Sequence, residues 1–217
     1  IMSKQTASSD TNAPLPRLWG TYLDIDQAMT ILANASRANV GMGDHVTVSL
    51  SVGGGILTGA DCPMADDVFY WTVEMLHSLN IPVVAATGNE GSNSAILWPA
   101  CTPKVIKVAG TILKNGNDSF WRGSNIVNPA TSNSPFFLAP ACVVSSGLNS
   151  GPTGGHSDPY CGTSASTPHV AGLYALIKQA APGITVDQAT AWILDYASNP
   201  VQTGYGYAVQ SIKLPPL

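Results

Sequence analysis

Hydrophobic residues follow two patterns that alternate along the chain: helical spacing in some segments, and short uninterrupted apolar runs in others. Apolar residues at helical spacing predict helices over residues 24–38, 66–79, 164–180 and 186–197. Short apolar runs, rich in β-branched residues or ended by glycine, predict strands at residues 45–52, 81–86, 105–109 and 142–145. Residues 1–21 predict a short strand followed by a loop. Strands that alternate with helices favour an α/β fold with a mainly parallel sheet, and the run at 81–86 is typical of a strand covered on both faces.

Composition narrows the class of protein further. The chain has 217 residues, of which 10% are charged and 45% hydrophobic, and its formal net charge is −4. Low charge argues against disorder, and the excess of acidic over basic residues argues against a nucleic-acid partner. There is no run of about 18 apolar residues, so no membrane-spanning segment is predicted. Without an internal repeat or a linker, residues 1–217 are expected to form one domain.

The four cysteines, Cys62, Cys101, Cys142 and Cys161, fit no spacing of zinc ligands. They allow two disulfides in three pairings, and the alternative is four buried free thiols. Low charge and loops rich in serine, glycine and asparagine fit an extracellular or secreted protein. The chain begins with Ile1 and no signal-peptide core follows, so its start reflects cleavage or a chosen boundary.

The most informative segment runs from Gly162 to Gly172 and reads GTSASTPHVAG. It places Ser164 at the start of a predicted helix, where unpaired backbone N–H groups and the helix dipole favour developing negative charge. A nucleophilic serine benefits from this arrangement. The simpler interpretation of Ser164 is an ordinary helix N-cap.

This segment resembles the serine motif of the subtilases, the subtilisin-like serine peptidases. Other resembling segments follow in the family's order, at residues 48–54, 85–91, 98–100, 105–109, 137–140 and 205–206. The resemblance implies a three-layer α/β/α fold. It also implies that Ser164 is the nucleophile, with its own backbone N–H and the Asn89 side-chain amide as donors to the oxyanion. Residues Ser51, Val52 and Gly53 would pair with substrate, and Ala86, Thr87 and Gly88 would form the opposite wall of the specificity pocket.

None of the four histidines fits the family's catalytic motif H-G-T-H. His169 lies on the predicted serine helix, where the family has a structural histidine, and His77 lies on another predicted helix. His45 leads into a strand, and His156 lies in a glycine-rich loop. The chain also lacks the family's D-[ST]-G after an apolar strand, since Asp10 follows no such strand.

We therefore interpret residues 1–217 as the C-terminal portion of one catalytic domain, with the first strands of its fold absent. The favoured explanation is a serine endopeptidase whose triad Asp and His come from a separate upstream chain of the same precursor, cut in a surface loop. One alternative is a catalytically inactive homologue that binds peptides or assembles with other chains. Another is an isolated fragment that binds or assembles without catalysis.

The related sedolisin family is a further alternative, because it shares the serine motif. Its helix carries a Glu four residues before an Asp, but Gly20 stands there before Asp24, and its oxyanion residue is Asp where this chain has Asn89. Asp24 then reads as a helix N-terminal acid.

Specificity and metal binding give weaker signals. Leu97 stands near the place where the family has a small residue, and it would make the pocket shallower. We interpret Glu90 as a solvated acidic residue of a loop rather than as an acidic residue at the rim of the specificity pocket. We interpret three acidic residues after a glycine-rich loop, Asp61, Asp66 and Asp67, as solvated surface groups or helix N-caps rather than calcium ligands. No cofactor or metal is therefore assigned, although structural calcium is common in the family.

Overall fold

The computed structural model describes residues 22–39, 41–62, 68–144 and 160–213. It contains four α-helices within these ranges: α1 (Tyr22–Ala38), α2 (Val68–Ser78), α3 (Thr163–Ala180) and α4 (Val186–Tyr196). Two short 3-10 helices are η1 (Met42–His45) and η2 (Pro129–Thr131). The predicted helices are thus all present, with ends shifted by two residues or fewer.

The strands are more numerous than the sequence predicted. They are β1 (Val48–Leu50), β2 (Gly54–Thr58), β3 (Val83–Ala86), β4 (Ile96–Trp98), β5 (Ile106–Lys114), β6 (Asn117–Phe120), β7 (Phe136–Pro140), β8 (Cys142–Val143), β9 (Tyr160–Cys161), β10 (Ser198–Gln202) and β11 (Ala208–Ile212). The strand predicted over residues 45–52 is shorter, because the chain leaves the sheet after Leu50. The strand predicted within residues 1–21 lies outside the described residues.

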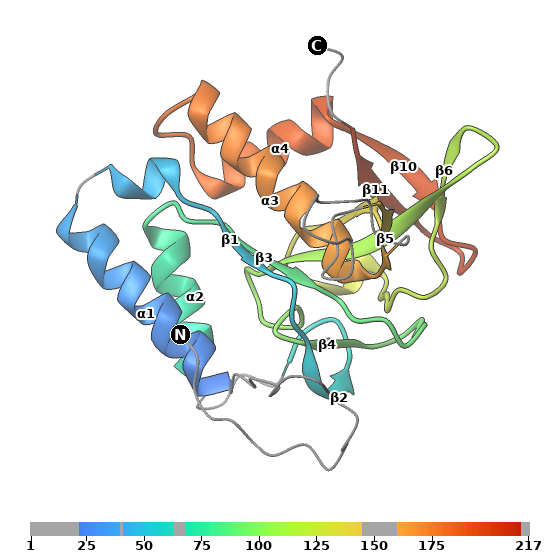
Figure 1. The fold of residues 1–217 in the computed structure, drawn as a ribbon, viewed down its shortest axis with the longest axis horizontal. Coiled ribbons are helices and arrows are strands. Elements are labelled where there is room, and N and C mark those ends of the chain that lie inside the picture. The colour runs from blue at the N-terminus through green and yellow to red at the C-terminus, as the bar shows by residue number, and fades with distance from the viewer. Residues whose placement is uncertain (1–21, 40, 63–67, 145–159, 214–217) are drawn as a thin grey trace, which may run out of the picture.

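The central sheet has the strand order β1-β3-β5-β7-β11-β10, and β6 pairs with β5 at one end (Figure 1). The pairs from β1 through β11 are parallel, and only β6 and β10 run antiparallel to their neighbours. This confirms the predicted mainly parallel sheet. Among the described residues, β1 pairs on one side only, with β3, so its other edge is open.

Helices cover both faces of this sheet. Helices α1 and α2 pack together on one face, and α3 crosses the other beside β3, β5 and β7, with α4 next to it. Each face has its own hydrophobic cluster: Val83, Ala85 and Ala109 point toward α1 and α2, and Val84 and Val108 point toward α3 and α4. Because β3 is buried along its whole length, the structure confirms the three-layer α/β architecture expected for its continuous apolar run.

All four cysteines are paired, as Cys62–Cys101 and Cys142–Cys161. The free-thiol alternative is therefore wrong. The first bond ties the loop after β2 to the segment after β4, and the second joins β8 to β9 just before α3. Among the described residues, no helix has both the length and the apolar character needed to cross a bilayer.

A buried lysine lies beneath the loop that carries the first disulfide. The side chain of Lys107 in β5 is fully buried, and its Nζ lies 3.6 Å from Asp61 Oδ1. Burial lowers the pKa of Lys107 to about 8, while the Asp61 carboxylate acts in the opposite direction. Asp61 is thus only partly solvated, because Oδ1 is buried beside Lys107 while the side chain as a whole stays 24% exposed. Asp66 and Asp67 lie outside the described residues.

Candidate active site

Ser164 occupies the first turn of α3, whose first residue is Thr163. Backbone N–H groups in the first turn have no carbonyl partner within their own helix, and they lie at the positive end of the helix dipole. Gly162 precedes the helix in an extended conformation and provides no side-chain cap. At the start of α3, the Thr163 N–H donates to Asn89 and the Ala165 N–H donates to the Gly162 carbonyl, and the Ser164 N–H between them is the predicted oxyanion donor.

Pro168 changes the hydrogen bonding of this turn. A proline has no N–H, so the carbonyl four residues earlier, that of Ser164, loses its helical partner. Ser51 takes that place, because its Oγ donates to the Ser164 carbonyl at 2.8 Å. In return, Ser164 Oγ donates to the Ser51 carbonyl at 3.3 Å. The predicted nucleophile is thus joined directly to the predicted substrate-binding segment, more than a hundred residues earlier in the chain.

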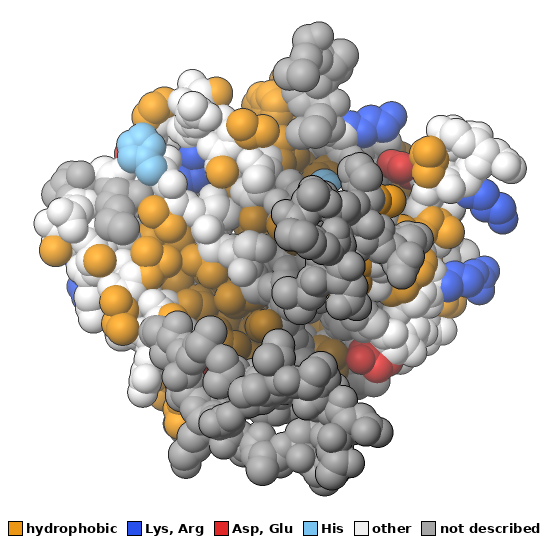
Figure 2. All heavy atoms as spheres, viewed as in Figure 1, with side chains coloured by type: hydrophobic (Ala, Val, Ile, Leu, Met, Phe, Trp, Pro, Cys, Tyr) orange, Lys and Arg blue, Asp and Glu red, His pale blue; other side chains and the backbone are white. Residues whose placement is uncertain are grey.

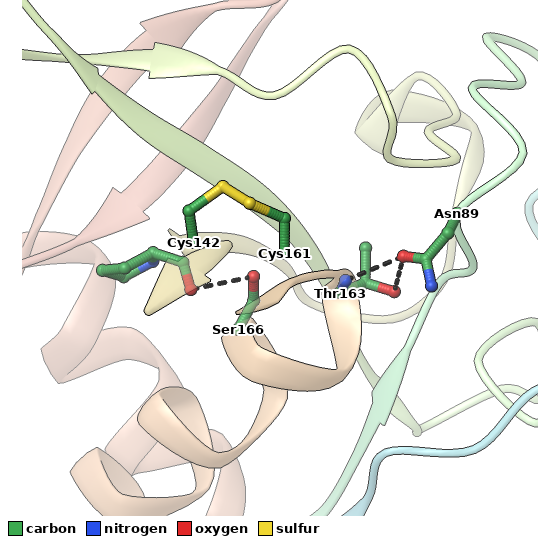
Figure 3. The surroundings of a disulfide bond; sticks show 6 residues. Asn89, Cys142, Cys161, Thr163 and Ser166 are labelled. Atoms are coloured by element: carbon green, nitrogen blue, oxygen red, sulfur yellow. Dashed lines mark hydrogen bonds between the residues drawn. A yellow bond between two sulfur atoms is a disulfide. The ribbon is translucent and has the colours of Figure 1, made fainter. Parts of the chain in front are cut away.

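Asn89 reaches the same turn from the loop after β3. Its side-chain Oδ1 accepts from the Thr163 N–H at 2.8 Å and from the Thr163 Oγ1 hydroxyl at 3.0 Å (Figure 3). The Gly88 N–H donates in turn to Thr163 Oγ1 at 3.2 Å. Because a backbone N–H can only donate, the Asn89 atom that faces it is the oxygen. The donor atom of this carboxamide, Nδ2, is therefore the one that does not face Thr163.

The two predicted walls of the specificity pocket approach each other around one side chain. The first wall continues from β1 as Ser51, Val52 and Gly53, and Val52 is 44% exposed. The second runs from Ala86, the last residue of β3, through the buried Thr87 to Gly88. All six predicted substrate-binding residues thus lie in segments that lead toward Ser164 and Asn89, and their roles stay predictions.

Leu97 in β4 lies between these walls. Its N–H donates to the Thr87 carbonyl at 3.0 Å. A methyl group added at Gly53 would lie 3.3 Å from Leu97 Cδ1, and one added at Gly88 would lie 2.8 Å from the same atom. The side chain therefore fills the space next to both glycines, consistent with the shallow pocket that the sequence suggested.

Glu90 is an exposed loop acid, as the sequence suggested, and it also contacts the site. Its Oε2 accepts from the Asn89 N–H at 3.0 Å and from the side-chain amide of Asn125. The carboxylate thus turns back onto the loop that carries it. Asn125 was missed by the sequence analysis, since it lies in a polar stretch without a recognisable motif.

Of the described histidines, His77 and His169 contact partners other than Ser164, and His45 lies in a different element. His45 lies in η1, and His77 Nε2 lies 3.2 Å from Asp187 Oδ1. His169 is exposed, and its Nδ1 lies 2.8 Å from the Ala165 carbonyl of its own helix. His156 lies outside the described residues. In the described part of the chain, Ser164 therefore has a carbonyl and not an imidazole as its hydroxyl partner.

The described residues also contain no group of three or more His, Cys, Asp or Glu side chains arranged to hold a metal ion. Asp26, two residues after the sedolisin-like position Asp24, accepts a hydrogen bond from Thr72 Oγ1 at 2.7 Å. It joins α1 to α2, on the side of the sheet opposite α3. This location favours a structural role for the carboxylate.

Comparison with known proteins identifies the same family along most of the chain. The family model described as "Subtilase family" matches residues 24–208. The minor extracellular protease Epr of Bacillus subtilis is 28% identical over 167 residues, which are 67% of this chain and 24% of that protein. An extracellular protease of Xanthomonas campestris is 32% identical over 155 residues, 70% of this chain and 23% of that protein. The chain thus spans about a quarter of these relatives.

Solved structures give the same result for the fold. Sphericase matches with a TM-score of 0.70 and 25% identity, covering 90% of this chain and 64% of that one. A cold-adapted subtilisin-like serine proteinase matches with a TM-score of 0.67 and 23% identity, covering 91% of this chain and 63% of that one. The sheet and helices described above are therefore the arrangement found in these structures.

Proposed function

Because the chain belongs to the subtilase family, we propose that it is the serine-bearing part of a secreted serine endopeptidase. The observation that carries the proposal is the meeting of Asn89, Thr163 and Ser164 at the start of α3. Thr163 holds the carboxamide oxygen, so the donor end of Asn89 is fixed beside the helix turn that carries the serine. Secretion is supported by two disulfides, which persist in oxidising compartments, and by the extracellular relatives.

In the proposed reaction, Ser164 Oγ attacks a peptide carbonyl carbon and gives its proton to a histidine base. The carbonyl oxygen becomes an oxyanion, which accepts hydrogen bonds from the Ser164 N–H and from Asn89 Nδ2. The amine then leaves with the proton from the base, and water hydrolyses the ester on Ser164 by the reverse sequence. Backbone groups of residues 51–53 align the substrate as an added strand. This chemistry needs no cofactor.

The histidine and its orienting aspartate are proposed to come from a second polypeptide, an upstream segment of the same precursor. The edge of β1 suits this partner: within the part of the chain that the structure describes, β1 pairs only with β3, and its open side lies next to the Ser51–Ser164 contact. Partly exposed hydrophobic side chains lie along α1 and β1, namely Ile25, Leu32, Val48 and Leu50. Figure 2 shows a hydrophobic area on this side of the molecule. A strand paired with β1 would satisfy the edge and cover part of this area.

The test is labelling of Ser164 by a fluorophosphonate, with intact-mass measurement of every chain in the sample. We expect a second polypeptide in active material, and labelling of Ser164 only when that polypeptide is present. A serine without a base is a poor nucleophile, so residues 1–217 alone should remain unlabelled. Failure to label with the upstream polypeptide bound would overturn the peptidase proposal and favour an inactive, peptide-binding homologue.

Leu97 is expected to restrict the substrate residue before the scissile bond to glycine or alanine. The Leu97→Gly variant should raise kcat/KM for a phenylalanine substrate, relative to its alanine counterpart, by about 10–100-fold, because burying a phenylalanine side chain is worth about 1.5–3 kcal/mol. Paired peptide p-nitroanilides measure the ratio.

Leu113→Ala is the matched control, since that leucine is 75% exposed at the end of β5. Equal cleavage of both substrates by the unmodified protein would contradict the predicted restriction.

A further inference from the structure

The loop that carries Asn89 is organised by one side chain from elsewhere in the chain, that of Asn125. Asn125 lies between β6 and η2 and is fully buried. Its Oδ1 accepts from the Glu90 N–H at 3.1 Å and from the Ser92 N–H at 3.0 Å. Its Nδ2 donates to the Thr87 carbonyl at 3.1 Å and to Glu90 Oε2. Both ends of the carboxamide are therefore used on the loop from Thr87 to Ser92.

The backbone of Asn125 contacts the same loop. Its N–H donates to the Gly88 carbonyl at 3.0 Å, and its carbonyl accepts from Thr87 Oγ1 at 2.8 Å. The loop itself turns through Gly88 and Gly91, which have φ values of 106° and 68°. Because such a loop lacks the ladder of a helix or strand, these contacts replace regular secondary structure as its source of rigidity.

A direct connection leads from Asn125 to the oxyanion residue. Asn125 Nδ2 holds the Glu90 carboxylate, and the same Glu90 Oε2 accepts from the Asn89 N–H at 3.0 Å. Thr163 fixes the other end of Asn89, its side-chain oxygen. Asn89 is thus held at its backbone through Asn125 and at its side chain through Thr163.

We propose that Asn125 is a positioning residue that fixes the orientation of the Asn89 amide toward the oxyanion. This inference rests on the proposed function. Asn125 is buried and acts through Glu90 and Asn89, so it does not touch substrate. Its role is chemically specific, because a carboxamide of this length supplies two donors and two acceptor sites at once. An aspartate keeps the acceptors but loses both donors, and it places a second carboxylate against Glu90.

The experiment compares Asn125→Asp with Asn128→Asp in the assembled peptidase. Asn128 lies three residues later in the same loop, where its Oδ1 caps η2 by accepting from the Ala130 N–H, a role that aspartate keeps. We expect Asn125→Asp to lower kcat by about 10–100-fold with little change in KM, because small displacements of a catalytic group cost up to about 10² in rate. Asn128→Asp should leave both constants unchanged.

One combined variant separates positioning from general destabilisation. In the Asn89→Ala background, adding Asn125→Asp should change kcat by less than about threefold, because residues that act as one unit are not additive. Multiplicative losses would overturn the inference.

A readout independent of turnover is the NMR signal of the Asn89 side-chain amide. We expect Asn125→Asp to shift this signal and Asn128→Asp to leave it unchanged. If the unmodified assembly proves inactive, the proposed function fails, and the NMR comparison still decides the positioning role. An unshifted Asn89 amide in Asn125→Asp would refute that role.

Discussion

Replacement of Ser164 by alanine is expected to lower kcat by about 10⁶-fold, the loss typical of removing a triad nucleophile. The physical reason is that the hydroxyl oxygen forms the acyl-enzyme bond, and no neighbouring group can replace it. The fold should survive, because the hydrogen bond from Ser51 Oγ goes to the Ser164 backbone carbonyl and does not need the side chain. Hydrolysis of a peptide substrate by the assembled protein, with circular dichroism as a check of folding, measures the effect.

Ser166→Ala is the matched control in the same helix. Its hydroxyl is buried and donates to the Pro140 carbonyl at 3.2 Å, away from Asn89 (Figure 3). Removing it should cost about 1 kcal/mol of stability and leave kcat nearly unchanged. If Ser164→Ala kept the activity of Ser166→Ala, Ser164 would not be the nucleophile.

The Asn89→Asp variant is expected to lower kcat by about 10²–10³-fold with little effect on KM, as loss of an oxyanion donor does. Aspartate retains an oxygen for the two Thr163 donors, so the loop should keep its position. What changes is the other end of the side chain, where a donor becomes a negatively charged acceptor. Steady-state kinetics on one peptide substrate provide the measurement.

Asn93→Asp serves as the control, since Asn93 is an exposed residue of the same loop region and receives the same added charge. Its kcat should match that of the unmodified protein. Equal losses in the two variants would indicate a general charge effect and would contradict an oxyanion role for Asn89.

The layers of the fold could be predicted because burial on both faces leaves a continuous apolar run in the sequence, as in β3. The C-terminal hairpin of β10 and β11 could not be predicted. β10 contains Pro200 and polar residues without alternation, yet it forms a strand because it lies at the edge of the sheet, where a missing N–H is tolerated. Its partner β11 continues the parallel sheet beside β7, a pairing that depends on contacts distant in sequence.

For the site, the serine motif and the asparagine motif were recognisable because the chemistry is concentrated in short segments. The role of Asn125 could not be recognised from the sequence, and neither could the effect of Pro168 on the Ser164 carbonyl. Asn125 is informative only where its loop meets the loop of Asn89. Pro168 leaves the Ser164 carbonyl without its helical partner, and only the folded chain shows that Ser51 Oγ donates to this carbonyl.

The disulfide between Cys142 and Cys161 closes a loop of the chain immediately before α3. A single cut of the backbone between these cysteines would produce two pieces that remain covalently joined. β7 lies on one side of the bond and α3, with Ser164, lies on the other, and the two elements pack together in the central layers. The molecule therefore tolerates a backbone cut in this segment, because the serine helix stays tethered to the sheet for as long as the surroundings remain oxidising.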